Sequence, residues 1–217
     1  MNLKHPKYKL LSEPMSKSTD KNANKRAEED DEETDEEDDK KIYKENNHIY
    51  FYSEIDRNSI SKLNTLLRQA EEYCIVTSLR LRVDEIPIYL HIYSNGGYVH
   101  SAFAAIDVIK GCRVPVYSII EGATASAGTL ISVVCKKRFI RPTAYMLIHQ
   151  LSSECWCKMR EITDVYKNLT NMMTKITNIY TEYSNLTPKK LEKLLKHDLW
   201  LDSKKSIKYG LADELYV

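Results

Sequence analysis

The sequence predicts an α/β fold built on a mainly parallel sheet, and three observations support this class. Short apolar runs of strand length alternate with segments of helical periodicity from Asn47 to the C-terminus. The predicted helices are about 10–17 residues long, which suits right-handed βαβ crossovers between parallel strands. A heptad pattern over Met159–Tyr183 adds one helix that is longer than a crossover requires.

The first elements follow from apolar periodicity and from residues that favour helix starts and turns. Asn58 is a candidate N-cap, because its side-chain oxygen can accept a hydrogen bond from a free backbone N–H. Gly96 and Gly97 end the second strand and turn the chain into the next helix. In chain order we expect a strand at His48–Tyr52, a helix at Ser59–Cys74, a strand at Pro87–Tyr93 and a helix with apolar residues between 102 and 109.

The later elements follow the same alternation. Thr187 and Pro188 look like an N-cap and a first helical position, which start a short helix to Lys196. Asp202 is expected to cap the last helix, and Gly210 to end it. The expected ranges are a strand at Val114–Ile120, a helix that includes Leu130–Cys135, a strand at Tyr145–Ile148, the long helix within Met159–Tyr183, and a final strand at Asp213–Val217.

The long helix carries a heptad seam that is wider than one core contact needs. A second apolar row lies beside the first, at Val165, Met172 and Ile179. We favour a contact between subunits over packing within one chain. The main row recurs at alternating intervals of four and three residues: Ile162, Tyr166, Leu169, Met173, Ile176, Tyr180 and Tyr183.

The charge of the chain is unevenly distributed. The 217 residues include 32 Lys or Arg and 31 Asp or Glu, a net charge of +1. Eleven carboxylates occupy twelve positions in the acidic tract 28–39, whereas residues 40–217 hold 25 basic and 18 acidic side chains, a net charge of +7. Residues 1–41 lack periodicity and hold few large apolar groups after Leu11, which predicts a disordered arm before a folded domain at 42–217. The arm is either a solubilising tail or a shield for basic surface.

Composition also indicates the compartment. The sequence offers no run of about 18 apolar residues that could span a membrane and no apolar secretory signal. Five cysteines without framework spacing favour reduced thiols. We therefore expect a cytoplasmic protein. Many Lys, Asn, Ile and Tyr residues hint at an AT-rich genome, and a viral origin would place the chain in the host cytoplasm.

Three features indicate one catalytic site at the carboxyl edge of the sheet. Ser126 lies among small residues between a strand and a helix, where free backbone N–H groups favour developing negative charge. Gly97 can direct its N–H into a cleft, as an oxyanion hole requires. His149 follows an apolar strand, and ligands of open α/β sheets collect at that edge. Taken singly, each also has a structural explanation: a helix cap, a tight turn and a buried histidine.

Together these residues supply a nucleophile, a base and an oxyanion site. A serine hydroxyl becomes a good nucleophile when an imidazole accepts its proton, and a carboxylate fixes the imidazole tautomer. Asp198 and Asp202 are the candidates for that carboxylate after His149.

Three motifs resemble those of the proteolytic subunit of Clp protease, ClpP. They are Gly122-Ala-Thr-Ala-Ser126-Ala-Gly, Met146-Leu-Ile-His149-Gln150 and Ser94-Asn-Gly-Gly97. The resemblance runs from Ile49 to Val217. It implies a ClpP/crotonase-like spiral of βαβ units with a protruding long helix, and a heptameric ring or tetradecamer. It also implies Ser126 as nucleophile, His149 as base, Asp198 as third triad residue, and the N–H groups of Gly97 and Ala127 as the oxyanion hole, with Asp202 as a cap.

The chain departs from the ClpP pattern at several positions. Asn95 stands where the family has Pro, and Ala127 where it usually has Met, although both changes leave the backbone N–H groups in place. Leu151 replaces a Pro, and Cys155-Trp156-Cys157 falls where the family has a Gly-rich strand. The acidic arm takes the place of the loop that meets the AAA+ unfoldase. A partnership with an unfoldase is therefore not supported by the sequence.

The function expected from the sequence is ATP-independent peptide-bond hydrolysis by a self-assembling serine endopeptidase acting on peptides or unfolded proteins. We expect no cofactor, metal, nucleic acid or membrane. Cys155 and Cys157 lack the further ligands of a zinc site, and no phosphate-binding glycine motif is present. Two alternatives remain: a crotonase-like acyl-CoA enzyme, and a catalytically silent scaffold subunit of the ClpP type.

Overall fold

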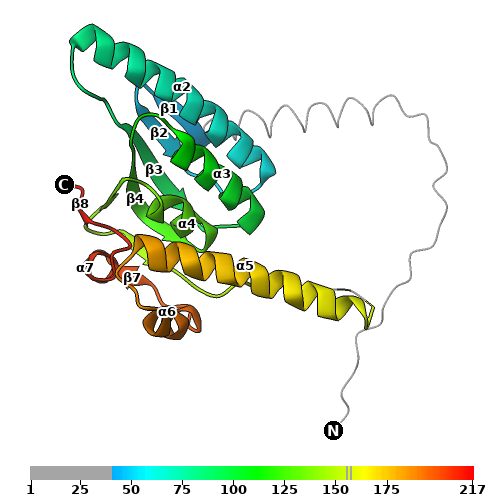
Figure 1. The fold of residues 1–217 in the computed structure, drawn as a ribbon. Helices are drawn as coiled ribbons and strands as arrows, with labels where there is room; N and C mark the ends of the chain where they lie inside the picture. Colours follow the sequence, from blue (N-terminus) through cyan, green and yellow to red (C-terminus); the bar gives the residue numbers. More distant parts are fainter. Residues whose placement is uncertain (1–40, 155, 157) are drawn as a thin grey trace, which may run out of the picture. The chain divides into compact units, whose positions relative to one another are not determined.

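The protein is described by a computed structural model that covers residues 41–154, 156 and 158–217 (Figure 1). Of the predicted arm at 1–41, all residues but Lys41 lie outside the described residues, as do Cys155 and Cys157. In chain order the elements are β1 (Ile42–Glu45), β2 (His48–Phe51), α2 (Arg57–Leu81), β3 (Ile88–Ser94), α3 (Val99–Gly111), β4 (Val116–Ala125), α4 (Ala127–Val133), β5 (Lys137–Ile140), β6 (Tyr145–Leu147), α5 (Glu161–Tyr183), α6 (Pro188–Leu195), β7 (Leu201–Asp202), α7 (Ser203–Lys208) and β8 (Glu214–Leu215).

The strands form one mainly parallel sheet, which confirms the predicted α/β class. The order is β1-β2-β3-β4-β5-β8, and β6 pairs with β4 on one side and with β7 on the other. Among the strands that the structure describes, only the pairs β1–β2 and β6–β7 are antiparallel. On the side away from β3, the long strand β4 has two partners in turn: its first part pairs with β5, and Ala123–Ala125 pairs with Tyr145–Leu147 of β6. The carboxyl ends of β4 and β6 therefore lie side by side.

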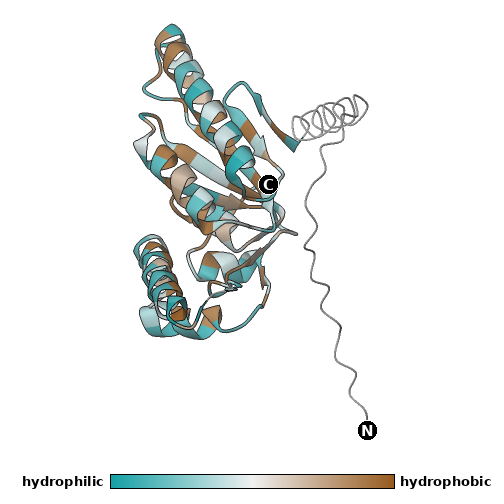
Figure 2. Cartoon of the chain, turned by 90° about the vertical axis from the view of Figure 1, so that its right-hand side faces the viewer, coloured by the Kyte–Doolittle hydropathy of each residue, from teal (hydrophilic) through white to brown (hydrophobic). Residues whose placement is uncertain are grey.

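Side chains of β3 alternate between the two faces of the sheet, as the period of two requires. Ile88, Leu90 and Ile92 are buried beneath helices, and the contacts of β1–β4 with α2 and α4 show that these helices cover this face. Apolar and polar positions alternate along α2, as expected for helices that bury one side (Figure 2). The apolar core of the domain lies in this layer.

The opposite face of the sheet carries a network of aromatic and ionisable side chains. Glu121 accepts hydrogen bonds from Tyr52, from Nδ1 of His91 (3.1 Å) and from Arg141 (3.2 Å). Nε2 of His91 lies 3.0 Å from Nδ1 of His48. We call these five residues the outer-face network. It ties β2, β3 and β4 together on the side that the helices leave uncovered.

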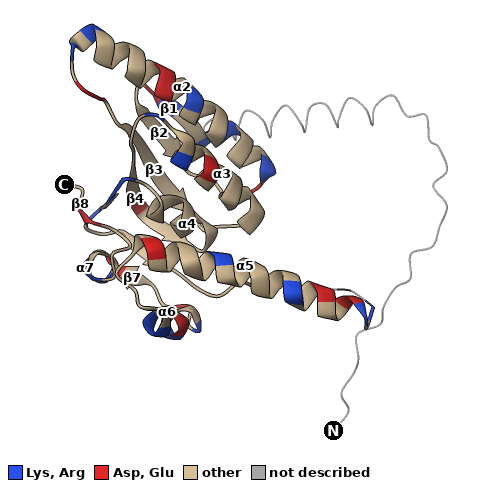
Figure 3. Cartoon of the chain, viewed as in Figure 1, with Lys and Arg blue, Asp and Glu red and all other residues tan. Residues whose placement is uncertain are grey.

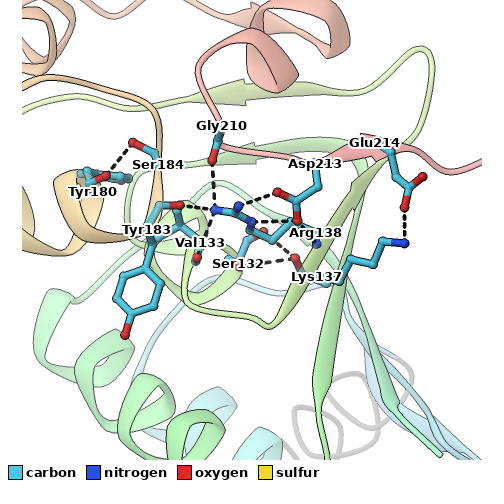
Figure 4. Close-up of polar contacts among 11 residues, drawn as sticks. Ser132, Val133, Lys137, Arg138, Tyr180, Tyr183, Ser184, Gly210, Asp213 and Glu214 are labelled. Carbon is cyan, nitrogen blue, oxygen red and sulfur yellow. Dashed lines mark hydrogen bonds and ion pairs between the residues drawn. The ribbon is translucent and has the colours of Figure 1, made fainter.

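Arg138 on β5 joins the C-terminal elements to the sheet (Figure 4). Its guanidinium forms a two-pronged ion pair with Asp213, with an Nε–Oδ2 distance of 3.1 Å. Nη1 donates to the carbonyl oxygens of Tyr183 at the end of α5 and of Gly210 (2.9 Å). One side chain therefore fixes the end of the long helix and the start of β8 against β5.

Several sequence predictions were wrong in detail, and the helix expected at Ser59–Cys74 runs from Arg57 to Leu81. Asn58 is not the N-cap of α2: the carboxylate of Asp56 accepts from the N–H of Ser59 (2.7 Å), and Ser59 Oγ accepts from the N–H of Asp56. The strand predicted to end at Ile120 runs on to Ala125. Its last residues are small rather than apolar, but they pair with β3 and β6. By contrast, Asp202 does cap α7, because its carboxylate accepts from the N–H of Lys205 (2.8 Å).

The heptad seam of α5 divides into two halves. Ile176 and Tyr180 are buried within the chain against α4, with Ile176 only 4% exposed. Toward the start of the helix the seam is open, and Tyr166 is 70% exposed. Only this first half remains available for a contact between subunits.

Candidate active site

Ser126 occupies a strained turn between β4 and α4. Its φ of 53° and ψ of −126° lie in a region that non-glycine residues rarely adopt, and such strain clusters at functional sites. The backbone N–H of Ser126 donates to the carbonyl oxygen of Leu147 on β6 (2.8 Å), which holds the turn. The side chain makes no capping hydrogen bond to α4. The hydroxyl is therefore not used as a helix cap.

At Gly96 and Gly97 the backbone lies closer to its neighbours than any amino acid with a side chain would allow. A Cβ on Gly96 would lie 2.6 Å from Cβ of Ser126, and one on Gly97 would lie 2.2 Å from the carbonyl oxygen of Ile55. Both glycines have positive φ, 98° and 144°. Close packing of Gly96 against Ser126 and of Gly97 against the Ile55 backbone thus requires glycine at both positions, beyond the needs of a tight turn.

His149 joins the same site from the next strand. The register pairs Ala125 with Leu147, so the residues that follow β4 and β6 emerge together. His149, Ser126, Gly97 and Ala127 line one small cavity of about 60 Å³. Within the described part of the chain, no hydrogen bond connects the side chains of Ser126 and His149. The cavity brings together four of the five residues that the sequence indicated for the site.

Two backbone donors belong to residues that line this cavity, Gly97 and Ala127. Ala127 is the first residue of α4, and the first N–H groups of a helix have no partner within it. Among the residues that the structure describes, neither the N–H of Gly97 nor that of Ala127 has a hydrogen-bond acceptor. This is the arrangement that an oxyanion hole needs, because its donors must be free to bind developing charge.

Asp198 lies outside the cavity. It is exposed, in the segment between α6 and β7, and the described residues include no hydrogen bond or ion pair between it and His149. The segment is nevertheless tied to the site, because the N–H of Gln150 donates to the carbonyl oxygen of Leu195 (2.8 Å). Asp198 thus lies three residues after Leu195, which this hydrogen bond holds next to Gln150.

Two further residues of the site, Thr129 and Tyr180, were not predicted from the sequence. Thr129 on α4 bonds both the carbonyl oxygen of Ser126 (2.7 Å) and the hydroxyl of Tyr180 (2.6 Å). Tyr180 also lines the cavity, together with apolar residues that include Leu130 and Ile176. A threonine and a tyrosine 51 positions apart carry no pattern that links them. The heptad row instead suggested a partner subunit for Tyr180.

No metal or membrane site emerges from the described residues. Within them, no group of three His, Cys, Asp or Glu side chains could hold a metal ion. None of their helices is long and apolar enough to cross a membrane. Lys and Arg are spread over several helices and interspersed with Asp and Glu (Figure 3).

Comparisons with known proteins give matches to the Clp protease family. The family model of Clp protease matches residues 33–217. The ATP-dependent Clp protease proteolytic subunit 2 of Treponema denticola is 35% identical over 131 residues, which cover 59% of this chain and 66% of that protein. A proteolytic subunit from Streptococcus mutans is 33% identical over 132 residues, 59% of this chain and 67% of the relative. The matches thus span about two thirds of the length of these relatives.

A solved structure shows the same fold. A point mutant of ClpP1 from Listeria monocytogenes superimposes with a TM-score of 0.67 and 24% sequence identity, and the alignment covers 84% of this chain and 95% of the other. At this identity the likeness supports the fold alone.

Proposed function

The chain belongs to the Clp protease family, and from this premise we propose that it is a serine endopeptidase that hydrolyses peptide bonds without ATP. The observation that carries the proposal is the cavity in which Ser126, at a strained turn, meets His149 and the two free N–H groups of Gly97 and Ala127. The matched relatives are named ATP-dependent. Attack by serine and then water consumes no ATP, so the proposal concerns the hydrolytic step itself.

The chemistry proceeds in two steps. Ser126 Oγ attacks the carbonyl carbon of the peptide as His149 takes its proton, and the N–H groups of Gly97 and Ala127 bind the oxyanion. The intermediate collapses to an acyl-enzyme, and the leaving amine takes the proton from His149. Water then attacks the acyl group as His149 accepts its proton, and His149 returns that proton to Ser126 Oγ as the acid is released.

We assign the orientation of His149 to Asp198, as in a Ser-His-Asp triad. In the single chain Asp198 is exposed, so a hydrogen bond to His149 requires the segment between α6 and β7 to move. The hydrogen bond from Gln150 to Leu195 keeps that movement short. We also propose that the folded domain, residues 42–217, assembles through the exposed half of the α5 seam, around Ile162 and Tyr166.

The experiment compares turnover of a fluorogenic peptide by the native chain and by Ser126→Ala. Loss of a nucleophile is expected to remove almost all activity, a drop of about 10⁶-fold in kcat. Ser101→Ala on α3 is the matched control, and it should retain the native rate. Equal turnover by Ser126→Ala and the native chain would overturn the proposal.

One observation favours a second candidate, a catalytically silent scaffold subunit. Asp198 makes no hydrogen bond or ion pair with His149 among the described residues, and a triad without its carboxylate would be inactive or slow. Native mass spectrometry combined with the peptide assay distinguishes the two. An assembled ring that turns over no peptide supports the scaffold.

A further inference from the structure

We propose that Tyr180 is a positioning residue for the oxyanion hole, acting through Thr129 on the peptide unit that joins Ser126 to Ala127. The inference rests on the proposed function, since it assigns a role within that catalytic site. It concerns a contact between the long helix α5 and the start of α4.

The three groups form a buried chain of hydrogen bonds. The Tyr180 hydroxyl lies 2.6 Å from Oγ1 of Thr129, which lies 2.7 Å from the carbonyl oxygen of Ser126. The carbonyl has no proton, so the Thr129 hydroxyl must donate to it. The single proton of Thr129 is then committed, and Tyr180 must donate to Thr129. Each group in the chain therefore has a fixed role as donor or acceptor.

Burial makes this chain hard to replace. Thr129 is fully buried and Tyr180 nearly so. Burial raises the pKa of the Tyr180 hydroxyl, outweighing the opposite effect of its hydrogen bond to Thr129. Tyr180 therefore remains protonated, and remains a donor, throughout the physiological pH range. Removing it would leave the buried Thr129 oxygen without that donor.

Peptide planarity carries the effect to the catalytic centre. The carbonyl of Ser126 and the N–H of Ala127 belong to one planar unit and point in opposite directions. Holding the oxygen therefore aims the N–H. The N–H of Thr129 adds a second hydrogen bond to the same oxygen (3.1 Å). Hydrogen bonds to the carbonyl also polarise the peptide and strengthen its N–H as a donor.

Strain makes this restraint necessary. The ψ angle of Ser126 sets the orientation of the peptide unit, and the residue holds an unfavourable pair of angles, φ 53° and ψ −126°. Without a fixed oxygen, the unit could rotate toward a relaxed conformation and turn the Ala127 N–H away from the substrate. The loss would fall on the charged transition state, because the oxyanion forms only there.

The test measures kcat, KM and the rate at which a fluorophosphonate labels Ser126. Tyr180→Phe should lower kcat and the labelling rate about tenfold, the effect of losing one hydrogen bond of about 1.4 kcal/mol, with KM unchanged. Thr129→Val should do the same, and Thr129→Ser, which keeps the hydroxyl, should restore the native rate. The kcat of the double variant should fall little further than that of either single variant, because both changes break the same series of hydrogen bonds.

The control is Tyr183→Phe, which removes a hydroxyl three residues further along α5 and should leave kcat unchanged. An unchanged kcat in Tyr180→Phe and Thr129→Val overturns the inference, as does a fall in thermal stability or assembly without a fall in kcat. These results leave the proposed function intact if the native chain is labelled at Ser126. A native chain that is neither labelled nor active overturns the function and this inference together.

Discussion

The backbone N–H of Gln150 donates a 2.8 Å hydrogen bond to the carbonyl oxygen of Leu195. Gln150 follows the proposed base, His149, and Leu195 ends α6, three residues before Asp198. The two segments that must supply the base and its carboxylate are thus joined through the backbone. A change in the short segment after Leu195 is enough to alter the distance between the two side chains.

The role of Asp198 is tested by Asp198→Asn. Asparagine keeps the shape but stabilises the wrong imidazole tautomer, and in a known triad this change lowers kcat about 10⁴-fold. We expect a comparable loss of peptide turnover. Asp202→Ala is the control, because Asp202 caps α7. It should lower the free energy of unfolding by about 1 kcal/mol and leave kcat within a factor of a few. The reverse pattern would assign the triad to Asp202.

Assembly through α5 is tested by Tyr166→Glu. A carboxylate in the exposed half of the seam would be buried without a partner in an interface, which disfavours association. Native mass spectrometry should show a shift from a ring to smaller species. Asn168→Glu adds the same charge on another side of the helix and should leave the mass unchanged. If Tyr166→Glu also forms the native assembly, the seam is not the interface.

The contribution of Arg138 is tested by chemical denaturation of Arg138→Ala. The side chain is 15% exposed and binds Asp213 and three carbonyl oxygens. Its loss should lower the free energy of unfolding by about 2–3 kcal/mol. Arg113→Ala is the matched control. The Arg113 side chain is 73% exposed, so its ion pair with Glu71 should contribute only about 0.5 kcal/mol to the free energy of unfolding.

A second variant sharpens this test. Removing Asp213 as well as Arg138 should recover part of the lost stability, because the single variant leaves a carboxylate without its partner. Equal losses for Arg138→Ala and Arg113→Ala would show that Arg138 does not anchor the C-terminal elements.

The outer-face network predicts a loss of stability in acid. The pKa values of His91 and His48 are lowered from 6.5, mainly by burial. As the pH falls below about 6.5, the unfolded chain therefore binds more protons than the folded chain. The free energy of unfolding should therefore fall as the pH drops from about 6.5 toward the folded values. Burial acts to raise the pKa of Glu121, but hydrogen bonds from Tyr52, His91 and Arg141 outweigh it. The lowered pKa adds a second fall below 4.5.

Denaturation between about pH 7 and pH 5 measures the first of these effects. The double variant His48→Gln, His91→Gln should flatten the slope of stability against pH. The exposed His197, changed to Gln, is the control and should leave the slope as it is. A double variant with the native slope would place the titration elsewhere in the chain.

Much of the site could be predicted because it lies at the ends of strands. Apolar runs located β3, β4 and β6, and parallel strands present their carboxyl ends at one edge. Gly97, Ser126 and His149 therefore had to come close. The end of β4 was missed because its residues, Gly122 to Ala125, are small and resemble a turn. Pairing with β6, which no local pattern reveals, makes them a strand.

Contacts between distant helices could not be predicted. The heptad row treats Tyr166 and Tyr180 alike, but α4 covers only the second half of α5, so one is exposed and the other buried. The hydrogen bond between Thr129 and Tyr180 depends on that packing. The position of Asp198 depends in the same way on how the segment after α6 lies against β6, which the spacing from His149 does not determine.

The most direct test of the account is the site of covalent modification by diisopropyl fluorophosphate. The intact native chain is treated, weighed by mass spectrometry and digested to locate the adduct. We expect one adduct per chain, on Ser126, with none in Ser126→Ala and slow labelling in His149→Ala. A folded native chain that stays unmodified, or that carries its adduct on another residue, would contradict the claim that Ser126 is the nucleophile.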